Sequence, residues 1–125
     1  MEPQKKLYDL QDRTLIFAKR IRDYCFRLLK NSANNEYIPQ LIRAGSSPGS
    51  NYIEANESIG DKDVKMKVRT CRRESKEARY WLQLSITDGS DEMENERNWL
   101  VDEARQFVLI FNSILKGREG GEQGF

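Results

Sequence analysis

The chain has 125 residues, of which 33% are charged and 38% hydrophobic, and its formal net charge at pH 7 is +1. It contains two cysteines and no histidine. This composition excludes His-dependent nucleophilic catalysis, His-ligated zinc or haem, and a disulfide-dense framework. The length predicts one domain.

The N-terminal residues 1–6 are polar, and no apolar segment follows them, so we expect no signal peptide. The longest apolar run, residues 107–111, is far shorter than the roughly 20 residues that cross a bilayer. Cys25 and Cys71 both fall in helical patterns, and we expect them to be free and buried rather than bridged. Together these features predict a cytoplasmic protein without membrane contact.

The first predicted helix runs from about Asp9 to Ser32, with Asp9 as its N-cap. Its apolar residues recur at spacings of three and four, the period of one helical face. They are Leu10, Thr14, Phe17, Ala18, Ile21, Cys25, Leu28 and Leu29.

The second predicted segment runs from about Tyr37 to Ser58 and contains a run of small residues, 44–50, with a proline at position 48. Gly and Pro disfavour a helix interior by about 1 and 3 kcal/mol relative to Ala. Two interpretations stay open. The run is either a loop between two short helices or part of one kinked helix that a neighbour approaches closely.

The third predicted helix spans about Asp61 to Ile86, with a heptad-like apolar stripe that suits long, nearly aligned neighbours. The fourth spans about Asp91 to Leu115, with Gly117 as its C-cap. We expect a bundle domain over residues 1–116 and a disordered, glycine-rich tail over residues 117–125. No segment alternates like a strand, so the chain is predicted to be an all-α, antiparallel up-down-up-down four-helix bundle.

Three linked segments carry a family resemblance. PQLIRAGSSPGSNYIEA (39–55) resembles the signature QLxRSGxSxGANxxEA of a bacterial family. KDVKMKVRTCRRESKEARYWLQL (62–84) resembles its DFxxKxxIAxKEAxETxYWLxLL, and YDLQDRTLIFAKRI (8–21) its opening helix. The family comprises four-helix bundle proteins related to those encoded in intervening sequences of bacterial large-subunit rRNA, together with accessory variability proteins of diversity-generating retroelements.

The resemblance implies that the second helix passes through the Ser/Gly run and that the chains assemble into a homopentameric barrel. For the retroelement members it implies binding of nucleic acid and of a reverse transcriptase. The residues of this sequence that match the family's structural motif are Arg43, Gly45, Ser47, Gly49, Asn51, Glu54, Glu74, Tyr80 and Trp81.

The near-zero net charge conceals a strong asymmetry along the chain. Residues 1–60 carry a net charge of +2, residues 61–87 carry +4, and residues 88–125 carry −5. Six basic residues of the third helix fall on one broad face at 100° per residue. They are Lys62, Lys65, Arg69, Arg72, Arg73 and Lys76. This face would bind phosphates, or it is a solvated face that meets the acidic fourth helix or a neighbouring subunit.

Other side chains of interest receive structural interpretations. We expect Glu54 and Glu74 to pair with basic groups such as Arg43 and Arg79, or to hydrogen-bond to the second helix. Ser47, Ser50 and Asn51 are expected to be hydrogen-bonded inside the bundle, where Gly49 permits close packing.

The aromatic residues Tyr80 and Trp81 are predicted to lie in the core or an interface, with base stacking as the alternative. Trp99 lies off the main apolar face and is a candidate interface anchor.

No residue set predicts catalysis, a cofactor or a metal. A di-metal site at Glu54, Glu74 and Glu77 lacks the histidines such bundle sites require. The 46–51 run lacks the lysine and the preceding strand of a P-loop.

We therefore expect a non-enzymatic, self-associating scaffold or adaptor that binds RNA, DNA or a nucleic-acid-processing protein through the third helix. The alternative is a protein–protein module whose charges serve self-assembly and a protein partner.

Overall fold

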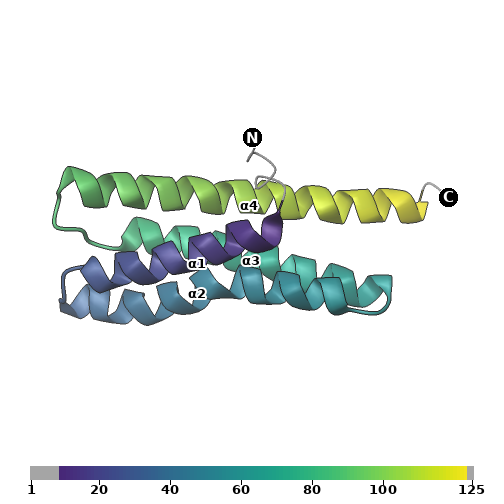
Figure 1. Cartoon of the computed structure of the whole chain (residues 1–125), viewed down its shortest axis with the longest axis horizontal. Coiled ribbons are helices and arrows are strands. Elements are labelled where there is room, and N and C mark those ends of the chain that lie inside the picture. The colour runs from purple at the N-terminus through teal and green to yellow at the C-terminus, as the bar shows by residue number, and fades with distance from the viewer. Residues whose placement is uncertain (1–8, 124–125) are drawn as a thin grey trace.

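Four helices pack against one another in the computed structural model, which describes residues 9–123 and the side chains of residues 9–118. They are α1 (Leu10–Arg27), α2 (Ser32–Glu57), α3 (Asp61–Leu84) and α4 (Asp91–Gln123). Each helix contacts two others: α1 and α3 both lie against α2 and α4. Successive helices run in opposite directions (Figure 1). The predicted all-α helical bundle is confirmed.

The apolar face predicted for the first helix is the face that α1 buries. Phe17, Ile21 and Cys25 are almost fully covered. Asp9 caps the helix, because its carboxylate accepts a hydrogen bond from the backbone N–H of Asp12 at 3.1 Å. The helix ends at Arg27 rather than Ser32, because the backbone of the next residue, Leu28, is extended.

Helix α2 begins five residues earlier than predicted, because Asn31 accepts a hydrogen bond from the N–H of Asn34 and caps it. The Asn34 side chain is fully buried and joins two loops. Its amide nitrogen donates to the carbonyls of Leu29 and Ile86, and its oxygen accepts from the N–H of Ile86. The predicted segments end at about Ser32 and resume at about Tyr37, which leaves position 34 in a loop. The structure instead uses this residue to tie 28–31 to 85–90.

The Ser/Gly run lies inside one continuous α2, which settles the choice between a loop and a single helix. Gly45 faces α1 so closely that a Cβ there would lie 2.8 Å from Cγ2 of Ile21. A Cβ on Gly49 would lie 3.0 Å from Oγ1 of Thr14. The buried Pro48 faces α3, where its carbonyl accepts a hydrogen bond from the thiol of Cys71 at 3.4 Å. Small residues thus let α2 approach both neighbours.

The last two helices differ from the prediction at their C-terminal ends. Helix α3 stops at Leu84, and Ser85 is its C-cap. Helix α4 does not end near Gly117 but continues to Gln123. Arg118 pairs with Asp61 at the start of α3 at 2.6 Å, which ties this extension to the bundle. The predicted tail therefore begins inside a helix, and only its residues 124–125 fall outside the described part.

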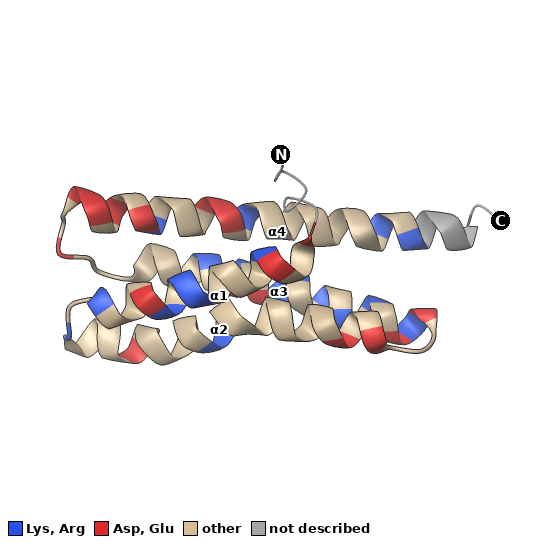
Figure 2. Cartoon of the chain, viewed as in Figure 1, with Lys and Arg blue, Asp and Glu red and all other residues tan. Residues whose placement is uncertain are grey.

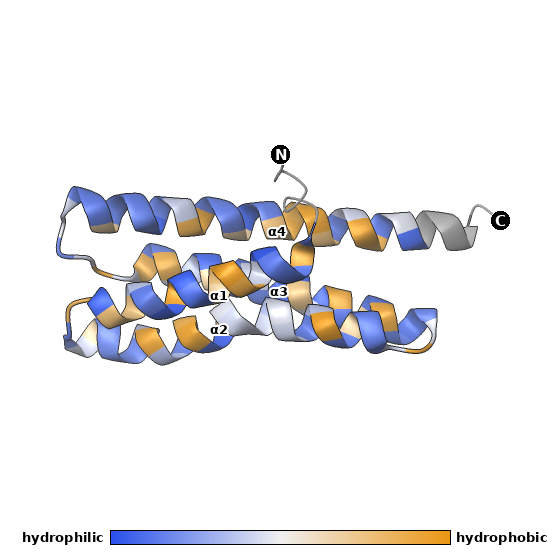
Figure 3. Ribbon diagram, in the orientation of Figure 1, coloured by the Kyte–Doolittle hydropathy of each residue, from blue (hydrophilic) through white to orange (hydrophobic). Residues whose placement is uncertain are grey.

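The four helices differ in length, so the bundle is not uniform along its axis. Helix α1 has 18 residues, whereas α4 has 33. In Figure 1, α1 begins near the middle of the bundle, and beyond that point only α2, α3 and α4 continue. Hydrophobic and hydrophilic residues alternate along every helix, as expected of amphipathic helices around one core (Figure 3). Within residues 9–123, none of the helices combines the length and apolar character that crossing a bilayer requires.

Candidate nucleic-acid interface

The six basic residues predicted to share a face of α3 do so, but they divide into two groups. Lys65 and Arg72 are partly covered at the edge next to α4. Lys65 pairs with Asp61 one turn earlier at 3.2 Å, and Arg72 donates to the side-chain oxygen of Asn112 on α4 at 2.8 Å. The other four are exposed on the outer side of the helix: Lys62, Arg69, Arg73 and Lys76.

Three acidic side chains of α4 are bound by arginines of α1. Glu92 pairs with Arg27 at 2.9 Å, and Glu96 pairs with Arg20 at 2.6 Å. Farther along α4, the carboxylate of Glu103 binds the guanidinium of Arg13 on α1. Figure 2 shows acidic residues gathered along the first half of α4 and basic residues spaced along α3. The negative C-terminal segment therefore offsets positive charge on α1.

Two acidic residues on α3 are bound by one arginine of α2. Arg43 donates to Glu74 at 2.8 Å and to Glu77 at 2.9 Å, which confirms the expected pairing of Glu74. The hydrogen bonds to Glu77 and Glu74 raise the pKa of Arg43. Glu54 pairs with Lys67 at 2.6 Å rather than with Arg79. These ion pairs join α2 to α3 and leave less uncompensated negative charge beside the basic face.

The polar residues of the α2 run bond within their own helix. Asn51 donates to the carbonyl and the hydroxyl of Ser47 at 3.0 and 2.9 Å. Ser50 is exposed and donates to the carbonyl of Ser47. None of these groups is arranged as a phosphate-binding loop. No cluster of three or more metal-ligating side chains occurs among the described residues.

Tyr80 and Trp81 differ in burial, although they are adjacent in the chain. Trp81 packs against the core, as predicted. Tyr80 does not lie in the core, because 58% of it is exposed. Their ring centroids lie 5.2 Å apart at an interplanar angle of 74°, and Trp81 also lies 6.0 Å from the ring of Tyr37 on α2.

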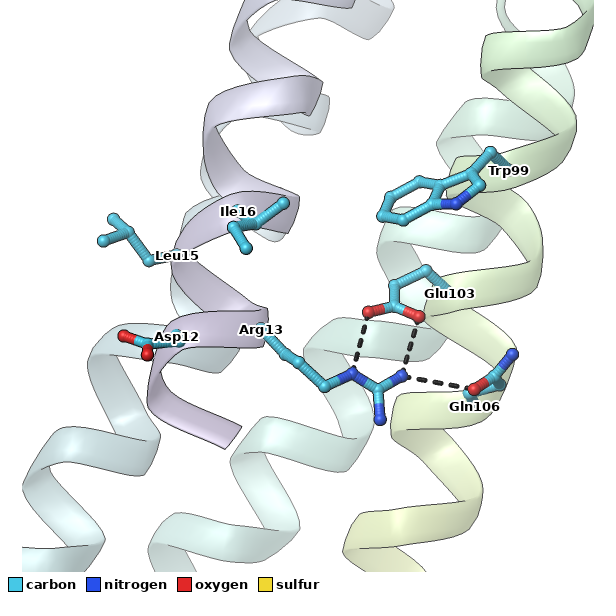
Figure 4. A pocket seen from close by; sticks show the side chains of 7 residues that line it. All are labelled: Asp12, Arg13, Leu15, Ile16, Trp99, Glu103 and Gln106. Carbon is cyan, nitrogen blue, oxygen red and sulfur yellow. Dashed lines mark hydrogen bonds and ion pairs between the residues drawn. The ribbon is translucent and has the colours of Figure 1, made fainter. Parts of the chain in front are cut away.

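A groove between α1 and α4 is a feature that the sequence analysis missed. It has a volume of about 580 Å³ and lies between Leu15 and Ile16 of α1 and Trp99 and Glu103 of α4 (Figure 4). Arg13 crosses it with two hydrogen bonds to Glu103, at 3.1 and 2.7 Å, and a third to Gln106. Leu15 and Ile16 fall outside the apolar stripe of the first helix, and these two adjacent exposed apolar residues were the signal available.

Trp99 lies on the rim of this groove, off the buried face, as the sequence predicts. The guanidinium of Arg20 lies 3.5 Å from the centroid of its ring while also bonding Glu96. This contact is a cation–π interaction that orients the indole. Figure 4 shows the ring directed across the groove toward Ile16.

Both cysteines are free and buried, as predicted. Burial raises the pKa of Cys25 and of Cys71 to about 12. Each is therefore a neutral thiol at pH 7, and neither has the lowered pKa of a reactive nucleophile.

The fold and the charged face define a small helical bundle with an exposed cationic helix. The chain is similar to a solved structure of a protein of unknown function from the S23 ribosomal protein family of Bacteroides thetaiotaomicron VPI-5482. The two share 25% sequence identity, and the match covers 85% of this chain and 97% of the other, with a TM-score of 0.71. Neither a family model nor a curated protein matches the chain.

Proposed function

We propose that this protein is a non-enzymatic, self-associating scaffold or adaptor that binds a nucleic acid or a nucleoprotein partner through the outer face of α3. The observation that carries the proposal is the separation of charge. Acidic residues of α4 neutralise arginines of α1, while Lys62 and Lys76 are exposed along one side of α3. Arg73 is exposed on the same side and also contacts Glu74 at 3.3 Å. Exposed cations in a row suit a polyanion, because each phosphate contact releases counterions.

Two similarities support the same assignment. The sequence resembles the bacterial rRNA intervening-sequence and retroelement accessory proteins, and the similar solved structure is described as a member of the S23 ribosomal protein family. The proposal includes the homopentameric barrel that the resemblance implies. In such a ring the modest charge of each chain would be repeated around an axis and produce a stronger field.

The test is a titration of fluorescently labelled RNA and DNA across a range of salt concentrations. The variant reverses three exposed charges, Lys62→Glu, Arg73→Glu and Lys76→Glu. We expect binding at about 50 mM salt that falls steeply by 200 mM, and a loss of at least tenfold in the variant.

The matched control reverses three exposed charges elsewhere: Lys19→Glu, Arg22→Glu and Lys116→Glu. Both variants change the net charge by the same amount, so only a difference between them assigns binding to α3. Absence of binding by the wild type at low salt, or equal loss in both variants, contradicts the proposal.

The groove between α1 and α4 favours a second candidate, a protein–protein module. Leu15 and Ile16 are about half exposed beside Trp99, and such aromatic anchors are frequent in interfaces. A mass measurement in solution tests self-association independently of nucleic-acid binding. A pentamer has five times the chain mass of 14.6 kDa. Self-association that Trp99→Ala disrupts, with no nucleic-acid binding, would favour this second function.

A further inference from the structure

The exposed face of α3 is not only basic. It ends in Tyr80, which has 58% of its surface exposed although it is a large aromatic residue. Its ring stands edge-on against Trp81, with 5.2 Å between centroids, and Trp81 is itself packed against the core. This support restricts the orientation of the Tyr80 ring while leaving much of the ring accessible.

Helical geometry places this ring in line with the cations. Tyr80 follows Lys62 by 18 residues, which is about five turns of an α-helix, so the two lie on the same side. Lys76 precedes Tyr80 by four residues and Arg73 by seven, the spacings of neighbours on one helical face. Both are exposed. A nucleic-acid strand whose phosphates contact these cations along α3 would therefore reach the ring of Tyr80.

Two carboxylates that precede Tyr80 on α3 are paired with an arginine of α2. Glu77, one turn before Tyr80, is bound by Arg43 from α2 at 2.9 Å, and Glu74 is bound by the same guanidinium at 2.8 Å. Arg43 is itself about half exposed and adds a cation on the α2 side. The surroundings of the ring are therefore compatible with a polyanion.

We infer that Tyr80 is a base-stacking residue and that α3 binds single-stranded RNA or DNA in preference to a duplex. In a duplex the bases stack on one another and their faces are covered, whereas an unpaired base can leave the strand and stack on an aromatic ring. The cations supply contacts to the phosphates, and the ring supplies a contact that only an unpaired base can use. This inference rests on the proposed function and specifies its ligand.

The test compares binding of a labelled 20-nucleotide single strand with that of a 20-base-pair duplex, at about 50 mM salt, in RNA and DNA forms. We expect the single strand to bind wild type more tightly. Tyr80→Leu should weaken single-strand binding by about 5- to 100-fold, the range of one lost stacking contact. Duplex binding and the salt dependence should stay unchanged, because the phosphate contacts remain.

Two variants serve as controls. Tyr80→Phe keeps the ring and should keep wild-type binding. Phe26→Leu removes an aromatic residue that is 73% exposed but lies on α1, and it should have no effect. Helical circular dichroism confirms that each variant is folded.

The outcomes separate this inference from the proposed function. If Tyr80→Leu binds the single strand like wild type, or the duplex binds as tightly as the single strand, stacking is overturned while binding through α3 stands. If wild type binds neither nucleic acid at low salt, both proposals fail.

Discussion

Helix α1 is held on its two sides by different physical means. Toward α2 the close contact depends on two glycines. Because Gly45 and Gly49 have no Cβ, the backbone of α2 can approach Ile21 and Thr14 of α1. Toward α4 the buried rings of Phe17 and Phe107 meet edge to face, with 5.2 Å between their centroids. Beside this apolar contact, long charged side chains cross an open groove, and the pair of Arg13 with Glu103 is the most buried of them. The first contact is sensitive to side-chain volume, and the second is sensitive to charge.

The largest expected effect is on the side where volume matters. Gly45→Leu places a side chain where even a Cβ would lie 2.8 Å from Ile21, and we expect a loss of about 3 kcal/mol or more in the free energy of unfolding. Urea denaturation measures it. Gly117→Ala is the control, because nothing lies within 4 Å of its Cβ position inside α4. It should stabilise the protein by up to about 1 kcal/mol. Wild-type stability of Gly45→Leu would contradict the close contact.

The next effect is on the charged side. The side chains of Arg13 and Glu103 are only 18% and 11% exposed. Glu103→Ala leaves the guanidinium covered without its carboxylate, so we expect a loss of about 2 kcal/mol in urea denaturation. Asp102→Ala, next in the chain, breaks an exposed pair with Arg105 and should cost less than about 0.5 kcal/mol. Equal effects of the two substitutions would show that burial of the Arg13 pair contributes nothing.

Alkaline pH tests the tightly packed interior. The pKa of each cysteine is raised from 9.0 to about 12 by burial, so only the unfolded chain ionises between these values. The contribution of the neutral thiols to the free energy of unfolding is therefore fully present below pH 9 and is lost as pH rises toward 12. At pH 10 the loss is roughly 1 kcal/mol per cysteine. Denaturation at pH 7 to 10 measures this, and Cys71→Ala should reduce the slope by about half. A slope that Cys71→Ala leaves unchanged would be inconsistent with a buried thiol.

Acid tests the charged side, with a smaller effect. The hydrogen bond from Arg27 lowers the pKa of Glu92 below 4.5. A lowered pKa contributes stability that is present above pH 4.5 and lost as pH falls through the folded-state value. Carboxyl NMR titration should show a lowered pKa for Glu92 that rises toward 4.5 in Arg27→Gln. A Glu92 pKa that does not respond to this substitution would contradict the ion pair.

The sequence predicts the helices well wherever their apolar spacing is regular, as in α1 and α3. It fails at ends that tertiary contacts decide. Asn34 lies within a run typical of a loop, but its amide satisfies backbone groups of two loops that are distant in sequence. Gly117 is a typical C-cap, but the helix continues, with Arg118 paired to Asp61.

The candidate site was predictable in part for the same reason. Helical geometry alone places the six basic residues of α3 on one face. Which of them is covered depends on α4, since Arg72 meets Asn112 only after the two helices pack. The positions of neighbouring helices likewise decide that Trp81 is packed against the core while Tyr80 is exposed. They also form the groove beside Trp99.

The short length of α1 gives the molecule a polarity along its axis. One end has four helices and two loops that Asn34 fastens together. The other end has three helices, the 58–60 loop and the far end of α4 (Figure 1). The two ends of the bundle are therefore chemically different surfaces, and a partner or a second copy that docks end-on can distinguish one end from the other.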